Sequence, residues 1–261
     1  MSIIGDSIST FRGYIFENQT SKYNPYYPNS WTESGETVWG NVLSERNTWW
    51  WKLIYNKMTN ARLEVLNAYS GSSCCYIDSG TANFSKHNVT DAASTTNAFR
   101  NRYRREGIGN PDLVIIYGGR NDFGKYGGST DDYLGTYTTA AIEAQYEAAL
   151  DKSYVYRNFT NALTGLITEI HVDFPKAQFL VLCHDMISDG YEASCKAVAS
   201  VLAGKGIDVK CVSFHKTGTK NQTNTVIGIT KDHGSSCHPD AAGTTKMSDY
   251  IYSQVGTWLD E

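Results

Sequence analysis

The sequence lacks the features that define several large classes of protein. None of its 261 residues lies in an apolar run approaching the ~18 consecutive residues that a membrane span requires. Lys and Arg number 23 against 27 Asp and Glu, and the resulting net charge of −4 gives no bulk positive field for a nucleic-acid backbone or an anionic membrane. The sequence therefore predicts a soluble protein with no membrane span and no nucleic-acid partner.

Cysteine is scarce and is not spaced for zinc or for a disulfide scaffold. The chain has 6 cysteines, none in a CxxC pair, and the adjacent Cys74 and Cys75 favour free thiols. The run Cys183-His184-Asp185 has no second cluster to complete the three or four ligands that zinc needs, so a structural role is expected. We predict neither a metal nor a cofactor.

The first residues also lack a secretory signal. Met1 to Gly5 carry no basic region and no long apolar region, and they lead directly into a predicted strand. The expected location is the cytoplasm, or outside the cell if a leader has been removed.

What the sequence does contain is a regular alternation of strands and helices. Short apolar runs predict five buried parallel strands at residues 2–4, 63–66, 113–117, 179–183 and 209–214. Helical segments are predicted at 48–58, 92–105, 140–169, 192–202 and 240–259. This alternation predicts an α/β fold, a parallel sheet covered on both faces. No linker or repeat divides the chain, so residues 1–261 are predicted to form one domain.

Aromatic residues are abundant, at 13% of the chain. The predicted long loop 10–36 carries Phe11, Tyr14, Phe16, Tyr23, Tyr26, Tyr27 and Trp31. Flat rings with polar neighbours suit stacking on sugars, so this loop is a candidate binding wall. A second loop, 123–138, is rich in Gly and Tyr, and long loops of this kind often bind ligands. The run Trp49-Trp50-Trp51 is expected to pack as part of a helix.

In parallel sheets of this kind the ligand site lies beyond the carboxyl ends of the strands. Ser7 follows the first predicted strand and is a candidate nucleophile, because a nearby His can take the proton of its hydroxyl. His238, just before the last helix, is the candidate base. A tetrahedral intermediate also needs fixed donors, which the N–H groups of Ser7 and Gly71 and the amide of Asn121 would supply.

Four segments that carry these residues resemble the blocks of one family. Gly5-Asp6-Ser7, Gly71, Gly119-Arg120-Asn121-Asp122 and His238-Pro239 occur in the order typical of the SGNH hydrolases, also called the GDSL esterase/lipase family. The resemblance spans nearly the whole chain. It implies a flavodoxin-like three-layer α/β/α fold, catalysis by Ser7 and His238, and an oxyanion hole formed by Ser7, Gly71 and Asn121.

The chain departs from that family at one position. The last family block reads Asp-x-x-His, whereas Ser235 stands three residues before His238. An orienting carboxylate fixes the tautomer of the imidazole, and its loss in a serine protease costs about 10⁴ in turnover. Asp232, a main-chain carbonyl near Ser235 or the Ser235 hydroxyl could replace it. Asp240 is a poorer candidate because a carboxylate at a helix start is explained by the helix dipole.

Several of these residues also have simpler explanations. Ser7, Gly71 and Gly119 could be ordinary turn residues, and Asn121 could bond its own backbone. Cys237 beside His238 is expected to be a structural cysteine rather than a nucleophile.

The leading hypothesis is a serine esterase that removes a short acyl group, such as acetyl, from a small-molecule or carbohydrate ester. The alternative is a catalytically weak or inactive protein of the same fold that binds a carbohydrate-like ligand.

Overall fold

A parallel sheet forms the centre of the molecule. The computed structural model describes residues 1–12, 14, 27, 30–33, 35–39, 41–76, 97–124, 133–154, 156–218, 228–231 and 237–261. Within these residues the sheet has five strands in the order β4-β1-β5-β6-β7. The strands are β1 (Ser2–Gly5), β4 (Val65–Ala68), β5 (Leu113–Gly118), β6 (Gln178–Cys183) and β7 (Val209–Ser213). All neighbouring pairs are parallel, and this is the flavodoxin-like order 2-1-3-4-5.

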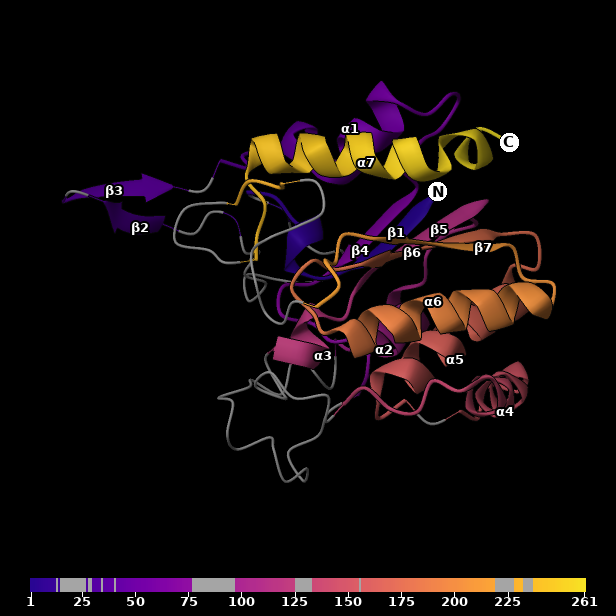
Figure 1. Cartoon of the computed structure of the whole chain (residues 1–261). Helices are drawn as coiled ribbons and strands as arrows, with labels where there is room; N and C mark the ends of the chain where they lie inside the picture. Colours follow the sequence, from indigo (N-terminus) through magenta and orange to yellow (C-terminus); the bar gives the residue numbers. More distant parts are fainter. Residues whose placement is uncertain are drawn as a thin grey trace.

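Helices cover both faces of the sheet (Figure 1). Helices α1 (Trp49–Asn56) and α7 (Ala241–Leu259) lie on one face. The other face is covered by α2 (Phe99–Glu106), α5 (Phe159–Asp173) and α6 (Asp189–Gly204). Helix α4 (Thr139–Leu150) packs on α5 and α6 rather than on the sheet. The predicted α/β fold with three layers is confirmed.

Alternating side chains of the strands feed two hydrophobic clusters, one on each face. Ile4 and Ile116 pack toward the face of α2, α5 and α6, while Ile3 and Ile115 pack toward α1 and α7. Strand β5 is buried along its whole length, as expected of a central parallel strand. Trp49 and Trp50 are buried in the cluster beneath α1 and α7, which confirms the expectation that they pack as part of a helix.

Several predicted boundaries shift, and one predicted helix is wrong. The segment 140–169 forms two helices, α4 and α5, because the chain leaves the helix at Lys152, whose φ is +64°. Asn158 then caps a new helix by accepting from the N–H of Asn161. The second strand begins at Val65 rather than at residue 63. The helix predicted at 92–105 begins later than expected, since α2 starts at Phe99. Residues 92–96 lie outside the described residues.

Smaller elements complete the described chain. The predicted loop 10–36 contributes to an antiparallel hairpin of β2 (Ser30–Glu33) and β3 (Glu36–Trp39). Two short 3-10 helices, η1 (Ser7–Ser9) and η2 (Glu45–Asn47), and the short α3 (Arg120–Gly124) lie between the larger elements. In the part of the chain that the structure describes, no helix combines the length and the apolar character needed to cross a membrane.

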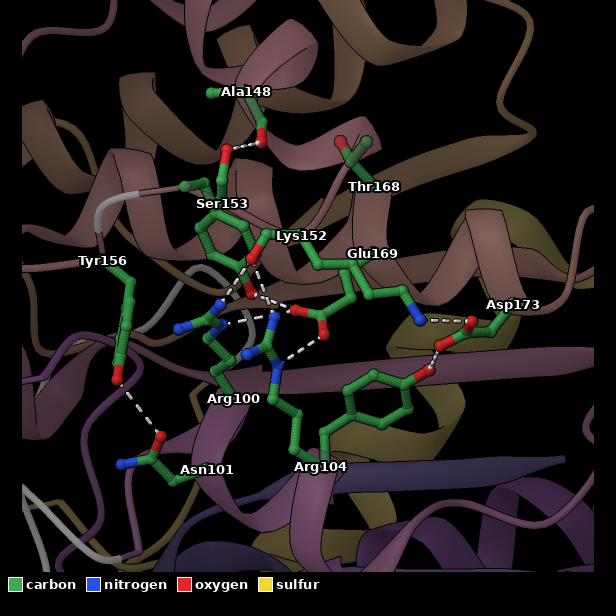
Figure 2. A network of polar contacts seen from close by, with 12 residues as sticks. Arg100, Asn101, Arg104, Ala148, Lys152, Ser153, Tyr156, Thr168, Glu169 and Asp173 are labelled. Carbon is green, nitrogen blue, oxygen red and sulfur yellow. Dashed lines mark hydrogen bonds and ion pairs between the residues drawn. The ribbon is translucent and has the colours of Figure 1, made fainter.

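A buried ionic network joins α2 to α5 (Figure 2). Glu169 on α5 accepts from Arg100 Nε at 3.3 Å, from Arg104 Nε at 2.5 Å and from Tyr154 Oη at 2.8 Å. The Arg100 guanidinium also lies 4.3 Å from the ring centroid of Tyr154. Because three donors meet a carboxylate that is almost fully buried, its charge is well compensated.

Candidate active site

Ser7 stands directly after the first strand of the sheet. Strand β1 ends at Gly5, and Asp6 caps the 3-10 helix η1 by accepting the Ile8 N–H at 3.0 Å. The hydroxyl and N–H of Thr10 both donate to the Ser7 carbonyl, at 2.7 and 3.1 Å. These bonds close a tight turn that fixes the Ser7 side chain at the carboxyl edge of the sheet.

His238 comes from the other end of the chain and meets Ser7 at this edge. Its Nε2 lies 2.7 Å from Ser7 Oγ, across 231 residues of sequence. Tyr27 supports the imidazole from one side, with its ring edge-on at 6.2 Å and its hydroxyl donating to Pro239 O at 2.6 Å. The structure therefore brings together the two residues that the sequence singled out as nucleophile and base.

The second nitrogen of His238 lies next to a thiol. Cys237 Sγ is 3.2 Å from His238 Nδ1, so the two neighbouring side chains do converge. The half-buried sulfur touches the imidazole on the side away from Ser7, and a structural rather than nucleophilic Cys237 stays a prediction. Asp232 and Ser235, the predicted contacts for this nitrogen, lie outside the described residues.

The segment that carries His238 is held by a buried ion pair. Lys231 Nζ lies 2.6 Å from Asp185 Oδ2 and donates to the Cys237 carbonyl at 3.3 Å. Burial lowers the pKa of His238 well below its ordinary value, and the charges of His184, Lys231 and Arg120 lower it further. The imidazole is therefore neutral near pH 7, which is the form that accepts a proton.

Gly71 occupies a tight turn after β4. The Ser72 N–H donates to Tyr69 O at 3.1 Å, which closes the turn, and Gly71 has φ +76°. A positive φ at this turn position favours glycine, because other residues meet a steric penalty there. The predicted role as a turn glycine is confirmed.

Asn121 reaches toward the same turn from α3. Its Nδ2 donates to Ser72 O at 3.0 Å and lies 3.5 Å from Asp6 Oδ2. One of the two amide hydrogens is thus committed to Ser72, while the other makes only the long contact with Asp6. The bond to Ser72 ties the Asn121 amide to the residue that follows Gly71.

Two buried acidic residues, Asp6 and Asp122, contact the segments that form this arrangement. Asp122 accepts the N–H groups of Cys74 and Cys75 at 3.0 and 2.9 Å, which anchors the chain beyond the turn. Burial raises the pKa of Asp6 to about 7, with a further increase from the nearby Asp122. Burial likewise raises the pKa of Asp122.

The site also contains donors without an acceptor. Among the described residues, neither Arg120 Nη1 nor His184 Nε2 has a hydrogen-bond partner, although both atoms are buried. The run Cys183-His184-Asp185 is not part of a metal cluster, since the described residues contain no group of three or more His, Cys, Asp and Glu that could hold an ion. His184 instead stacks on Tyr117, with ring centroids 5.8 Å apart.

Two rings of the aromatic loop are packed into the protein. Tyr14 and Tyr27 are buried, and Tyr14 donates its hydroxyl to Leu66 O at 2.6 Å. The binding wall expected of the loop as a whole stays a prediction. Phe16, Tyr23 and Tyr26 lie outside the described residues, as does the side chain of Trp31.

One buried residue beside the site was not found by sequence reasoning. Arg102 is fully buried on α2 and donates to Gly5 O at 2.8 Å and to Ser72 Oγ at 3.2 Å. Its segment, FRNRYRRE, reads as a strongly basic helix, and that composition suggests a solvated surface. No local signal distinguishes the buried arginine from its exposed neighbours.

The flavodoxin-like strand order defines an α/β protein, and Ser7 and His238 meet at the carboxyl edge of its sheet. The sequence profile of the GDSL-like lipase/acylhydrolase family matches residues 1–255. The chain belongs to this family.

Solved structures share the fold. A GDSL-like lipase from Bacteroides uniformis is 22% identical with a TM-score of 0.57, over 98% of this chain and 94% of that one. A second, from Bacteroides ovatus, is 23% identical with a TM-score of 0.58, over 98% and 97%.

A more distant likeness is a carbohydrate esterase family 2 enzyme with a carbohydrate-binding domain, from Corynascus thermopiles. It is 19% identical with a TM-score of 0.52, over 99% of this chain and 65% of that one. No curated protein sequence gives a significant match.

Proposed function

We propose that the protein is a serine esterase that removes short acyl groups, acetyl above all, from carbohydrate or similar polar alcohols. The observation that carries this proposal is the 2.7 Å contact between Ser7 Oγ and His238 Nε2, next to the Gly71 turn and the Asn121 amide. Membership of a lipase/acylhydrolase family supports ester chemistry.

The proposed reaction proceeds through an acyl-enzyme. Ser7 Oγ attacks the ester carbonyl carbon and passes its proton to His238 Nε2. The N–H groups of Ser7 and Gly71 and Asn121 Nδ2 donate to the oxyanion that forms. His238 then protonates the departing alcohol, and a water molecule activated by the same imidazole releases the acid.

The carbohydrate part of the proposal has separate support. A carbohydrate esterase family 2 enzyme shares the fold, and the donors Arg120 and His184 at the site suit a polar ligand. The alternative, a protein that binds a sugar without hydrolysis, predicts an imidazole turned away from the serine. The contact between Ser7 and His238 favours the esterase.

The test is hydrolysis of p-nitrophenyl esters of increasing acyl length by the wild type and by Ser7→Ala, His238→Ala and Ser9→Ala. Ser9 is a buried serine in the same 3-10 helix and serves as the matched control. We expect a preference for acetate, losses of about 10⁴-fold or more for Ser7→Ala and His238→Ala, and near wild-type turnover for Ser9→Ala.

Substrate class is tested by release of acetate from acetylated oligosaccharides. Full activity in Ser7→Ala would refute the nucleophile, and a preference for long acyl chains would refute the short acyl group. Oligosaccharide binding without acetate release, together with a Ser7 that does not react with a fluorophosphonate, would favour the binding protein.

A further inference from the structure

A buried guanidinium lies behind the candidate site and touches the segments that carry it. Arg102 projects from α2 and is 0% exposed, although its helix is strongly basic. Burying an arginine costs several kcal/mol unless its donors are satisfied, so its contacts show where the fold uses it.

The guanidinium bonds to the carboxyl ends of two neighbouring strands. On β1, Nη2 donates to Gly5 O at 2.8 Å. On β4, Nη1 donates to both the backbone and the side-chain oxygen of Asn67. Nε donates to Asn97 O at 2.8 Å, which fixes the start of the segment that leads into α2. One planar group thereby sets the relative position of β1 and β4 where both strands end.

These contacts lead directly to the proposed oxyanion donors. Gly5 stands two residues before Ser7, on the same strand end. Arg102 Nη2 also donates to Ser72 Oγ at 3.2 Å, and Ser72 follows Gly71. Ser72 O in turn accepts Asn121 Nδ2 at 3.0 Å. All three donor segments therefore connect to Arg102 through Gly5 or Ser72.

Arg102 also brings a positive charge close to the candidate site. The charge reaches the site, because Arg102 lowers the pKa of both Asp6 and Cys74 against the larger opposing effect of burial. A fixed positive charge in a water-poor interior stabilises a negative charge that develops nearby.

We propose that Arg102 is a positioning residue that aligns the donors of Ser7, Gly71 and Asn121. The inference rests on the proposed function and deepens it. Arg102 touches no substrate, and its effect passes through Gly5 and Ser72.

The test compares Arg102→Lys with Arg104→Lys. Lysine keeps the charge but cannot bridge Gly5, Asn67 and Ser72 together, because it lacks the planar fork. Arg104 is the matched control on the same helix, since it serves the Glu169 network instead. We expect kcat for p-nitrophenyl acetate to fall by roughly 10- to 100-fold in Arg102→Lys, with KM changed by less than about threefold. Arg104→Lys should lower Tm and leave kcat unchanged.

A second measurement distinguishes misaligned oxyanion donors from a general loss of rigidity in the fold. Phenylboronic acid forms a tetrahedral adduct with a reactive serine, so its inhibition constant reports the oxyanion donors. It should weaken in Arg102→Lys by the same factor as kcat/KM. If Arg102→Lys does not fold, Ser72→Ala removes the Arg102 contact with the Gly71 turn, together with the bonds from Ser72 Oγ to Tyr69 O at 2.8 Å and to Gly5 O at 3.4 Å. It should lower kcat about three- to tenfold.

Three results would overturn the inference. The first is a folded Arg102→Lys with wild-type kcat and boronate affinity, and the second is equal loss of kcat in Arg104→Lys. The third is unchanged kcat in Ser72→Ala when Arg102→Lys is unfolded. An inactive wild type with an unreactive Ser7 is a distinct result, which would refute the proposed function and the inference together.

Discussion

Two regions of this protein bury ionisable side chains, but only one of them surrounds a buried carboxylate with enough donors to compensate its charge. In the network of Figure 2, Glu169 accepts from Arg100, Arg104 and Tyr154, so a single carboxylate faces three donors. At the carboxyl edge of the sheet, burial and, to a smaller extent, the nearby Asp122 raise the pKa of Asp6 to about 7.

Unmet hydrogen-bonding capacity is likewise found in only one of the two regions. Among the described residues, no buried polar atom of the Glu169 network lacks a partner, whereas Arg120 Nη1 and His184 Nε2 do at the candidate site. A satisfied network rigidifies the fold, while unsatisfied buried donors are costly and are usual at functional sites. The difference agrees with a network that stabilises the fold and, under the proposed function, with an edge of the sheet that keeps donors for a ligand.

The largest expected effect comes from breaking the network. In Glu169→Gln the buried Arg100 loses the negative partner that compensates its charge, and the free energy of unfolding should fall by about 3–5 kcal/mol. Activity per folded molecule should stay unchanged, because the network does not touch Ser7 or His238. Urea unfolding and p-nitrophenyl acetate turnover measure the two quantities, and a specific loss of kcat without loss of stability would contradict the division.

The matching change at the site is Asn121→Ala, which removes a proposed oxyanion donor. Turnover should fall by about 10²–10³, with a much smaller change in stability. Asn101→Ala is the control, because Asn101 accepts from Tyr156 Oη at 3.3 Å beside the network and lies away from Ser7. Equal kcat values for the two variants would show that Asn121 has no special role.

A further expected effect is a pH dependence of stability. The pKa of Asp6 is about 7 in the folded chain, against an ordinary value of 3.8. Between these values the folded protein holds a proton that the unfolded chain has lost, so the stability contributed by Asp6 falls as pH rises from about 4 to about 7 and is constant above. Urea midpoints of the wild type and Asp6→Asn should therefore diverge across this window. Parallel profiles would mean that Asp6 ionises normally.

The sequence was sufficient to predict the parts of the molecule that repeat general rules. Apolar runs and their alternation with helices predicted the sheet, because parallel strands must be buried on both faces. The convergence of Ser7 and His238 was expected from the order of the family blocks, and the structure places His238 Nε2 2.7 Å from Ser7 Oγ.

The features that the sequence did not predict depend on the conformation of individual residues. The break between α4 and α5 rests on the positive φ of Lys152 and the cap at Asn158, which a helical pattern across residues 140–169 concealed. Arg102 lies in a basic run, yet its helix turns this one guanidinium toward β1 and β4. The contact of Cys237 with His238 likewise depends on a side-chain rotamer.

That contact between Cys237 and His238 has a practical consequence for assigning the nucleophile by inhibition. Alkylation of the half-buried Cys237 by iodoacetamide would place a bulky group against His238 Nδ1, 3.2 Å from the sulfur, and would disturb the base while Ser7 stays intact. Sensitivity to a thiol reagent would then imitate a cysteine hydrolase. Reagents that form a bond to the serine oxygen, compared between the wild type and Cys237→Ala, distinguish the two classes of enzyme.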